Sequence, residues 1–137
     1  MRYPAAGALR AASPLTGVAR CGIYHNVVFV ESRAFTRRLG ELAGDTAGEV
    51  LAAIQNDLLA NPQRGSRVQG LGGIRKARTS NPRRGKGKRG GLRYWYLHLE
   101  RRQHIHLLLL LDKNEREDLG SQERTALRRM VAELKRI

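Results

Sequence analysis

Cysteine is almost absent from this chain of 137 residues, which contains one, Cys21. A single cysteine excludes an internal disulfide framework and a zinc site built from cysteines, and it fits a reducing compartment. Long apolar runs are absent as well: IHLLLLL has the length of a strand, and no run approaches the roughly 18 residues that a membrane-spanning helix needs. The sequence therefore predicts a cytoplasmic protein of a size that suits one hydrophobic core.

Acidic residues are missing from one long segment. Between Leu58 and Leu99 the chain has eleven Lys and Arg and no Asp or Glu, within a whole-chain net charge of +14. A local excess of positive charge attracts polyanions, which means nucleic acid or an anionic membrane. The segment is interrupted by glycines and lacks the wide apolar face with which an interfacial helix enters a membrane. This pattern favours nucleic acid.

The N-terminal residues have a different composition from the rest. Residues 1–24 are rich in Ala, Arg, Ser and Gly and contain no acid. Arg10, Pro14 and Arg20 interrupt the apolar stretch that a signal peptide would need, although an organellar transit peptide has a similar composition. We expect residues 1–24 to be a disordered tail or an addition from an upstream start codon, and residues 25–137 to form the domain.

Hydrophobic periodicity predicts the elements of residues 25–137. β-Branched and aromatic residues favour strands at 26–32, 73–79, 92–99 and 105–111. Apolar residues at helical spacing predict helices at 32–43, 46–61 and from 121 onward, with Ser32 and Ser121 as N-caps and a capping box of Thr46 and Glu49. The order β-α-α-β-β-β-α predicts an α+β fold with a small antiparallel sheet, a helical hairpin and a C-terminal helix. We expect all helices on one face and a cationic platform on the other.

The segments FVESRAFTRRL, GLGGIRKART, RGKGKRGGLRYWY and LLLLLDKNEREDL carry a family resemblance. Their most specific patterns are GG-x-R-K-x-R, R-G-K-x-x-x-GG-x-R and K-N-E-x-x-D-L, in that order. From about Val28 to the C-terminus the chain resembles the RelE/ParE superfamily, and within it the HigB-like toxins. The resemblance implies a RelE-like fold and the toxin of a type II toxin–antitoxin module. Such a toxin is an endoribonuclease that cleaves mRNA in the ribosomal A site, where the ribose 2′-OH attacks its own phosphate without a metal or other cofactor. The resemblance also implies an antitoxin, often with a helix-turn-helix domain, encoded next to the toxin.

Metal-free cleavage of RNA requires alignment, neutralisation of charge on the phosphate and proton transfer. Arg and Lys bind phosphate oxygens, and a lysine crowded by other cations can transfer protons because like charges lower its pKa. Strand alternation places Lys76 and Arg78 on one face, opposite Arg75, and it gives Arg93 and Trp95 a common face. By resemblance, the catalytic residues are Lys76, Arg78, Arg93 and Lys113. The expected RNA-binding residues are Arg75, Arg83, Arg84, Lys86, Lys88, Arg89, Trp95 and Tyr96.

Several alternatives stay open on the sequence. Relatives often carry Tyr where this chain has Leu111, two positions before Lys113, and Trp95 or Tyr96 would have to replace it. Each charged residue is also compatible with a plain solvated surface. His98, His104 and His106 could supply zinc ligands, but no carboxylate or cysteine completes the set. The alternative functions are a ParE-like inhibitor of DNA gyrase and a non-catalytic RNA-binding module.

Overall fold

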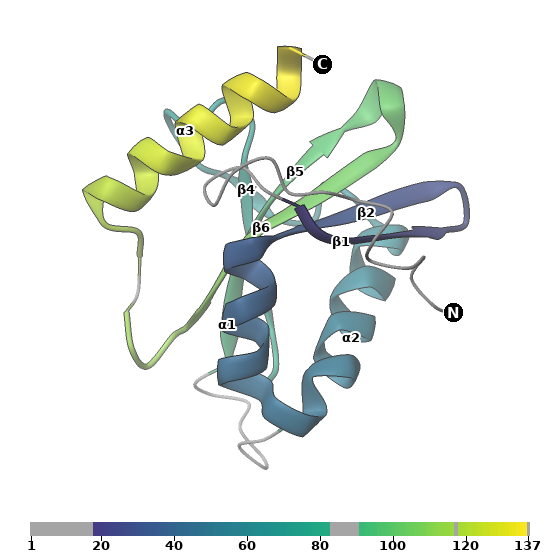
Figure 1. Cartoon of the computed structure of the whole chain (residues 1–137), viewed down its shortest axis with the longest axis vertical. Helices are drawn as coiled ribbons and strands as arrows, with labels where there is room; N and C mark the ends of the chain where they lie inside the picture. The colour runs from purple at the N-terminus through teal and green to yellow at the C-terminus, as the bar shows by residue number, and fades with distance from the viewer. Residues whose placement is uncertain (1–17, 83–90, 117, 137) are drawn as a thin grey trace.

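The computed structural model describes residues 18–82, 91–116 and 118–136 of the chain. In this part a six-stranded sheet is flanked by three α-helices (Figure 1). The elements in chain order are β1 (Val18–Tyr24), β2 (Val27–Ser32), α1 (Arg33–Ala43), the 3-10 helix η2 (Gly44–Thr46), α2 (Ala47–Ala60), β3 (Ser66–Arg67), β4 (Arg75–Thr79), β5 (Leu92–Leu99), the 3-10 helix η4 (Glu100–Arg102), β6 (His104–Asp112) and α3 (Ser121–Arg136).

The predicted α+β class, helical hairpin and C-terminal helix are confirmed. The sheet differs from the prediction because it is mixed: its order is β1-β2-β6-β5-β4-β3, with β2 and β6 parallel and the other neighbours antiparallel. The meander of β4, β5 and β6 follows from its short connections, as predicted. The parallel pair arises because β6 returns to the middle of the sheet, beside the first predicted strand.

The sequence predicts a domain boundary after residue 24, and the structure contradicts it. Residues Val18–Tyr24 form β1, joined to β2 by a turn at His25 and Asn26, whose φ angles are 48° and 69°. Positive φ at both turn residues matches the twist of a two-residue hairpin, and Asn tolerates that conformation well. The domain therefore includes residues 18–24. Residues 1–17 lie outside the described residues.

Helices cover both faces of the sheet, and the prediction of a single covered face is wrong (Figure 1). On one face α1 and α2 bury a cluster that includes Phe35, Ile54 and Tyr94. On the other face α3 buries a second cluster that includes Leu127 and Trp95. The reason lies in β5 and β6, which are apolar on both sides, and such strands leave no face for solvent.

The ends of the helices are partly as predicted. Ser32 caps α1, because its Oγ accepts a hydrogen bond from the Phe35 N–H at 3.0 Å, and the same hydroxyl donates to the Leu108 carbonyl at 2.7 Å. The capping box at α2 is wrong: the Thr46 hydroxyl donates to the Ala43 carbonyl at 2.7 Å and makes no cap bond. Among the described residues, no helix combines the length and the apolar character that crossing a membrane requires.

Candidate functional site

A cavity of about 250 Å³ lies where β4 ends, β5 begins and the chain leaves β6. Three predicted catalytic residues, Arg78, Arg93 and Lys113, line it. Among the residues that the structure describes, no Asp or Glu belongs to its lining. The remaining lining residues are Thr79, Ser80, Gly91 and Leu92.

The pairing of β4 with β5 sets the two arginines side by side. Arg78 and Arg93 are directly opposite in the antiparallel register, and side chains in that position share a face of the sheet. Arg78 is exposed, whereas Arg93 is only 9% exposed. One guanidinium is therefore held within the protein and the other extends from the rim, a combination suited to an anion that enters from solvent.

Leu111 forms the aliphatic side of this region. It pairs with Arg93 across β5 and β6, and it is buried in the apolar cluster under α3. Leu111, where the resemblance to the HigB-like toxins leads one to expect an aromatic residue, is therefore a core side chain in this protein.

Lys113 is positioned through its backbone and through Gly91. The Lys113 N–H donates to the Gly91 carbonyl at 3.1 Å, immediately after β6 ends. A Cβ at position 91 would lie 2.7 Å from the Thr79 carbonyl oxygen, a distance that side chains essentially never tolerate. Glycine is needed here because the backbone of β4 passes so close, and this approach keeps Lys113 near the ends of β4 and β5.

Lys76 does not join the other three predicted catalytic residues. It lies on the same face as Arg78, opposite Trp95 in the register, but outside the cavity lining. Its Nζ is 3.9 Å from Asp118 Oδ1, and 29% of its side chain is exposed. The structure thus divides the predicted set into a group of three and one cation beside it.

The predicted base-stacking role of Trp95 and Tyr96 is contradicted. Both residues are 0% exposed, because β5 is an interior strand with a helix layer on each face. The Tyr96 hydroxyl donates to the Pro62 carbonyl at 2.8 Å and accepts from the Gly65 N–H at 3.0 Å. Burial also raises the pKa of Tyr96. Neither buried ring can stack on a base as the expected substitute for an aromatic residue at position 111.

Arg75 is engaged within the fold. Its guanidinium donates to the Gly65 carbonyl at 2.7 Å and to the Gln63 carbonyl at 3.3 Å, where it fastens the segment before β3. The other predicted RNA-binding residues lie outside the described residues: Arg83, Arg84, Lys86, Lys88 and Arg89. Ser80 and Gly91, close to the two ends of the segment 83–90, both line the cavity.

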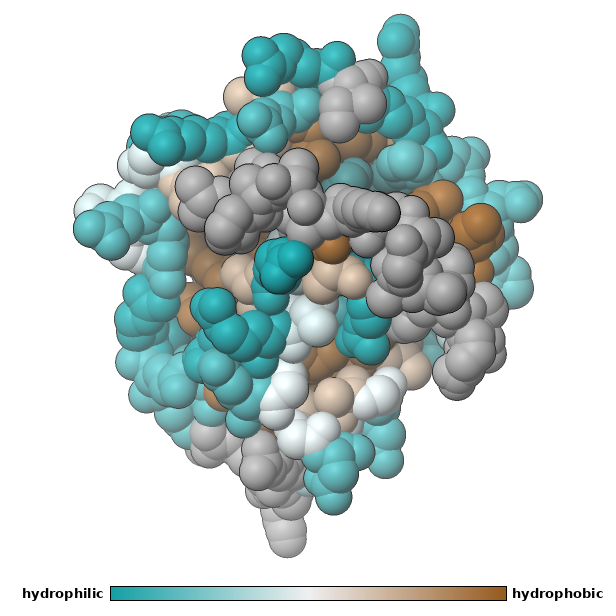
Figure 2. Space-filling model, viewed as in Figure 1, coloured by the Kyte–Doolittle hydropathy of each residue, from teal (hydrophilic) through white to brown (hydrophobic). Residues whose placement is uncertain are grey.

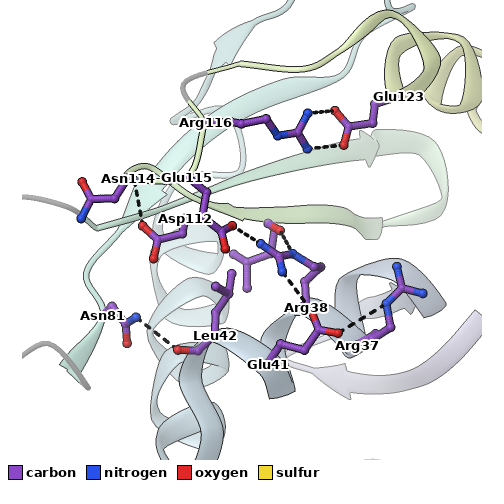
Figure 3. Close-up of polar contacts among 11 residues, drawn as sticks. Arg37, Arg38, Glu41, Leu42, Asn81, Asp112, Asn114, Glu115, Arg116 and Glu123 are labelled. Carbon is purple, nitrogen blue, oxygen red and sulfur yellow. Dashed lines mark hydrogen bonds and ion pairs between the residues drawn. The ribbon is translucent and has the colours of Figure 1, made fainter.

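Polar contacts that join the chain after β4 and the turn after β6 to the helices were not anticipated from the sequence (Figure 3). Buried Asn81 donates from Nδ2 to the Leu42 carbonyl at 3.3 Å, which links the chain after β4 to the end of α1. Arg38 of α1 forms an ion pair with Glu115, and Arg116 forms one with Glu123 of α3. The K-N-E pattern marks this turn in the sequence, but nothing there indicates the partners on α1 and α3.

The histidines do not form a metal centre in the described residues. His104 and His106 lie on one strand with ring centroids 5.9 Å apart. Burial, with smaller effects of His104 and Arg102, lowers the pKa of His106 to about 4. No group of three or more His, Cys, Asp or Glu in that part of the chain could hold a metal ion.

A larger groove of about 720 Å³ runs between α1 and α3. Its lining includes Ala34, Leu108, Leu127 and Met130. Figure 2 shows brown, apolar surface in this region, bordered by teal, hydrophilic side chains. The chemistry of this groove suits apolar groups, in contrast to the cationic cavity.

Comparison with known proteins places this geometry in a known fold. No protein-family model matches the chain. A solved structure of the E. coli toxin RelE, a variant with two arginines replaced by alanine in the free state, is similar with a TM-score of 0.50. The match has 12% sequence identity and covers 80% of this chain and 95% of that chain. The protein therefore has a RelE-like α+β fold, with a mixed sheet, a helical hairpin and a C-terminal helix.

Proposed function

We propose that the protein is the toxin of a type II toxin–antitoxin module, of the HigB-like branch, and that it cleaves ribosome-bound mRNA in the cytoplasm. The observation that carries the proposal is the cavity in which Arg78, Arg93 and Lys113 converge within a RelE-like fold. Its proposed partners are the ribosome with mRNA in the A site and a cognate antitoxin that has a helix-turn-helix domain and is encoded adjacently.

The reaction uses only groups of the protein, the RNA and water. The 2′ oxygen attacks the adjacent phosphorus, the bond from phosphorus to the 5′ oxygen breaks, and the products are a 2′,3′-cyclic phosphate and a 5′-hydroxyl. Arg78 and Arg93 bind the non-bridging oxygens and stabilise the charge that builds there. Water accepts the proton lost by the 2′-OH, and the Lys113 ammonium donates a proton to the leaving 5′ oxygen and is then reprotonated from water.

The cations outside the cavity hold the rest of the RNA. Lys76, on the same sheet face as Arg78, contacts a neighbouring phosphate. The basic residues of 83–90 bind the RNA backbone beside the cavity, where such contacts fix position rather than sequence.

The test is single-turnover cleavage of mRNA on purified ribosomes, with mapping of the 5′ ends. The wild-type protein is expected to give discrete cuts. Removing one cation of the cavity should lower the saturated rate about 100-fold, which corresponds to about 3 kcal/mol of transition-state stabilisation. Arg78→Ala is the cleanest variant because Arg78 is exposed. Arg128→Ala removes the same charge from an exposed position on α3 and should keep the wild-type rate.

Other results would replace the proposal. Inhibition of DNA supercoiling without mRNA cuts would assign the protein to the gyrase inhibitors. Binding to the ribosome or RNA with neither effect would make it an RNA-binding module. Wild-type cleavage rates in the Arg78→Ala and Lys113→Ala variants would move the reaction away from this cavity.

A further inference from the structure

The turn that carries Lys113 is tied to two helices by ion pairs (Figure 3). The Glu115 carboxylate pairs with Arg38 of α1. The guanidinium of Arg38 is itself fixed, because it also donates to Glu41 Oε1 at 2.8 Å and to the Leu110 carbonyl at 3.4 Å. On the other side Arg116 forms a two-pronged pair with Glu123, in which Nη1 lies 2.9 Å from Oε1.

The turn is also bonded internally. Asn114 N–H donates to the buried Asp112 carboxylate at 2.8 Å, and the Glu115 N–H donates to the Asp112 carbonyl at 2.9 Å. Together with the bond from Lys113 to Gly91, these contacts connect the backbone at Lys113 with β6, α1, α3 and the start of β5.

The two ion pairs contribute little to folding. The side chains of Glu115 and Arg116 are 50% and 44% exposed, and pairs with such exposed members typically contribute about 0–1 kcal/mol to stability. The Arg116 hydrogen bond lowers the pKa of Glu123, which keeps this carboxylate charged at neutral pH. What the pairs fix is geometry. Of the three described cations that line the cavity, Lys113 alone lies outside a strand, and a displacement of about 1 Å at a reacting centre can cost about 100-fold in rate.

We propose that Glu115 and Arg116 are positioning residues that hold Lys113 at the cavity through their pairs with Arg38 and Glu123. This rests on the proposed function, in which Lys113 acts on the scissile phosphate. Neither Glu115 nor Arg116 lines the cavity, so each acts through the backbone on either side of Lys113. We call these two pairs the Lys113 clamp.

The kinetic test is a double-mutant cycle with Lys113. Glu115→Ala is expected to lower the saturated cleavage rate about tenfold, and Lys113→Ala about 100-fold. The double variant should be no slower than Lys113→Ala alone, because a clamp without its lysine has nothing to position. Ribosome affinity and the urea midpoint should stay near wild type in Glu115→Ala, and Glu115→Gln, which keeps the hydrogen-bond acceptor, should recover part of the rate. The control is Glu133→Ala, which removes an exposed carboxylate from α3, away from the turn that carries Glu115.

A second measurement separates the clamp from the proposed function. In the absence of ribosomes, the NMR order parameter of the Lys113 amide should fall from about 0.85 to below about 0.7 in Glu115→Ala, and pyrophosphate should then shift this amide less. If wild type never cleaves but this loss of order occurs, the clamp stands and the nuclease reading fails. If wild type cleaves while Glu115→Ala keeps both the order and the rate, or slows the Lys113→Ala variant by a further tenfold, the clamp is refuted.

Discussion

Substitution of Arg20, which forms an ion pair with Glu31, tests whether β1 contributes to the stability of the domain. Glu31 is 0% exposed, and its Oε1 accepts hydrogen bonds from Arg20 Nη2 at 2.9 Å, from Arg20 Nε at 3.2 Å and from the Thr36 hydroxyl at 2.7 Å. Arg20→Met keeps most of the apolar stem and removes the charge. The buried carboxylate would then lose its ion pair and retain the hydrogen bond from the Thr36 hydroxyl.

The expected loss of stability is large for one substitution. Breaking a buried ion pair from one side costs about 3–5 kcal/mol, and the 36% exposure of Arg20 reduces this to about 2–4 kcal/mol. With a urea m-value of about 1.5 kcal/mol/M, a loss of about 3 kcal/mol lowers the unfolding midpoint by about 2 M. Chemical unfolding followed by Trp95 fluorescence measures this, because Trp95 is buried under α3.

Two comparisons make the measurement decisive. Arg37→Met breaks an exposed pair with Glu41, whose atoms are 3.9 Å apart, and should change stability by less than about 0.5 kcal/mol. Arg20→Met combined with Glu31→Gln should recover at least about 1 kcal/mol, because the buried charge is gone. An Arg20→Met variant as stable as Arg37→Met would refute the reasoning. Deletion of residues 18–24 would then be expected to be harmless, whereas the structure predicts that it is strongly destabilising.

Three further predictions concern titration and packing. Burial lowers the pKa of His106 to about 4. Its contribution to stability is therefore complete above about pH 6.5 and decreases by up to about 3 kcal/mol as the pH falls toward 4. In His106→Gln the urea midpoint should depend less on pH across this range. The pKa of Tyr94 is raised to about 12, chiefly by burial. Its contribution to stability is therefore complete below about pH 10 and decreases between pH 10 and 12. Tyr94→Phe should reduce this decrease, which is measured by unfolding together with the absorbance of tyrosinate. Gly91→Ala should cost about 1–3 kcal/mol and slow cleavage because of the Thr79 carbonyl 2.7 Å away, whereas Gly48→Ala, with nothing within 4 Å on helix α2, should be neutral or stabilising by up to about 1 kcal/mol.

Local patterns were enough to predict most elements and part of the site. Alternation correctly puts Lys76 and Arg78 on one face of β4, and Arg93 and Trp95 on one face of β5. The antiparallel register of the two strands then sets Arg78 opposite Arg93. The burial of Trp95 depends on α3 covering the second face, whereas Tyr96 is buried in the cluster under α1 and α2. The signal for two covered faces was the unbroken apolar character of β5 and β6. The pair of Arg38 and Glu115 in the Lys113 clamp could not be predicted from the sequence, because the two residues lie 77 positions apart and no local pattern connects them.

The electrostatic field at the cavity also depends on acids from outside the basic segment, which the charge of that segment alone does not include. No acid occurs between Leu58 and Leu99, yet Asp112 and Glu115 lie one and two positions from the cavity residue Lys113 in the chain. Glu115 is paired with Arg38 and Glu123 with Arg116, while Asp118 lies 3.9 Å from Lys76. Lys76 lies outside the cavity, and Asp118 is its carboxylate neighbour. The pairing of Glu115 with Arg38 and of Glu123 with Arg116 reduces the negative field that these two acids contribute, which favours an anionic ligand beside Arg78, Arg93 and Lys113.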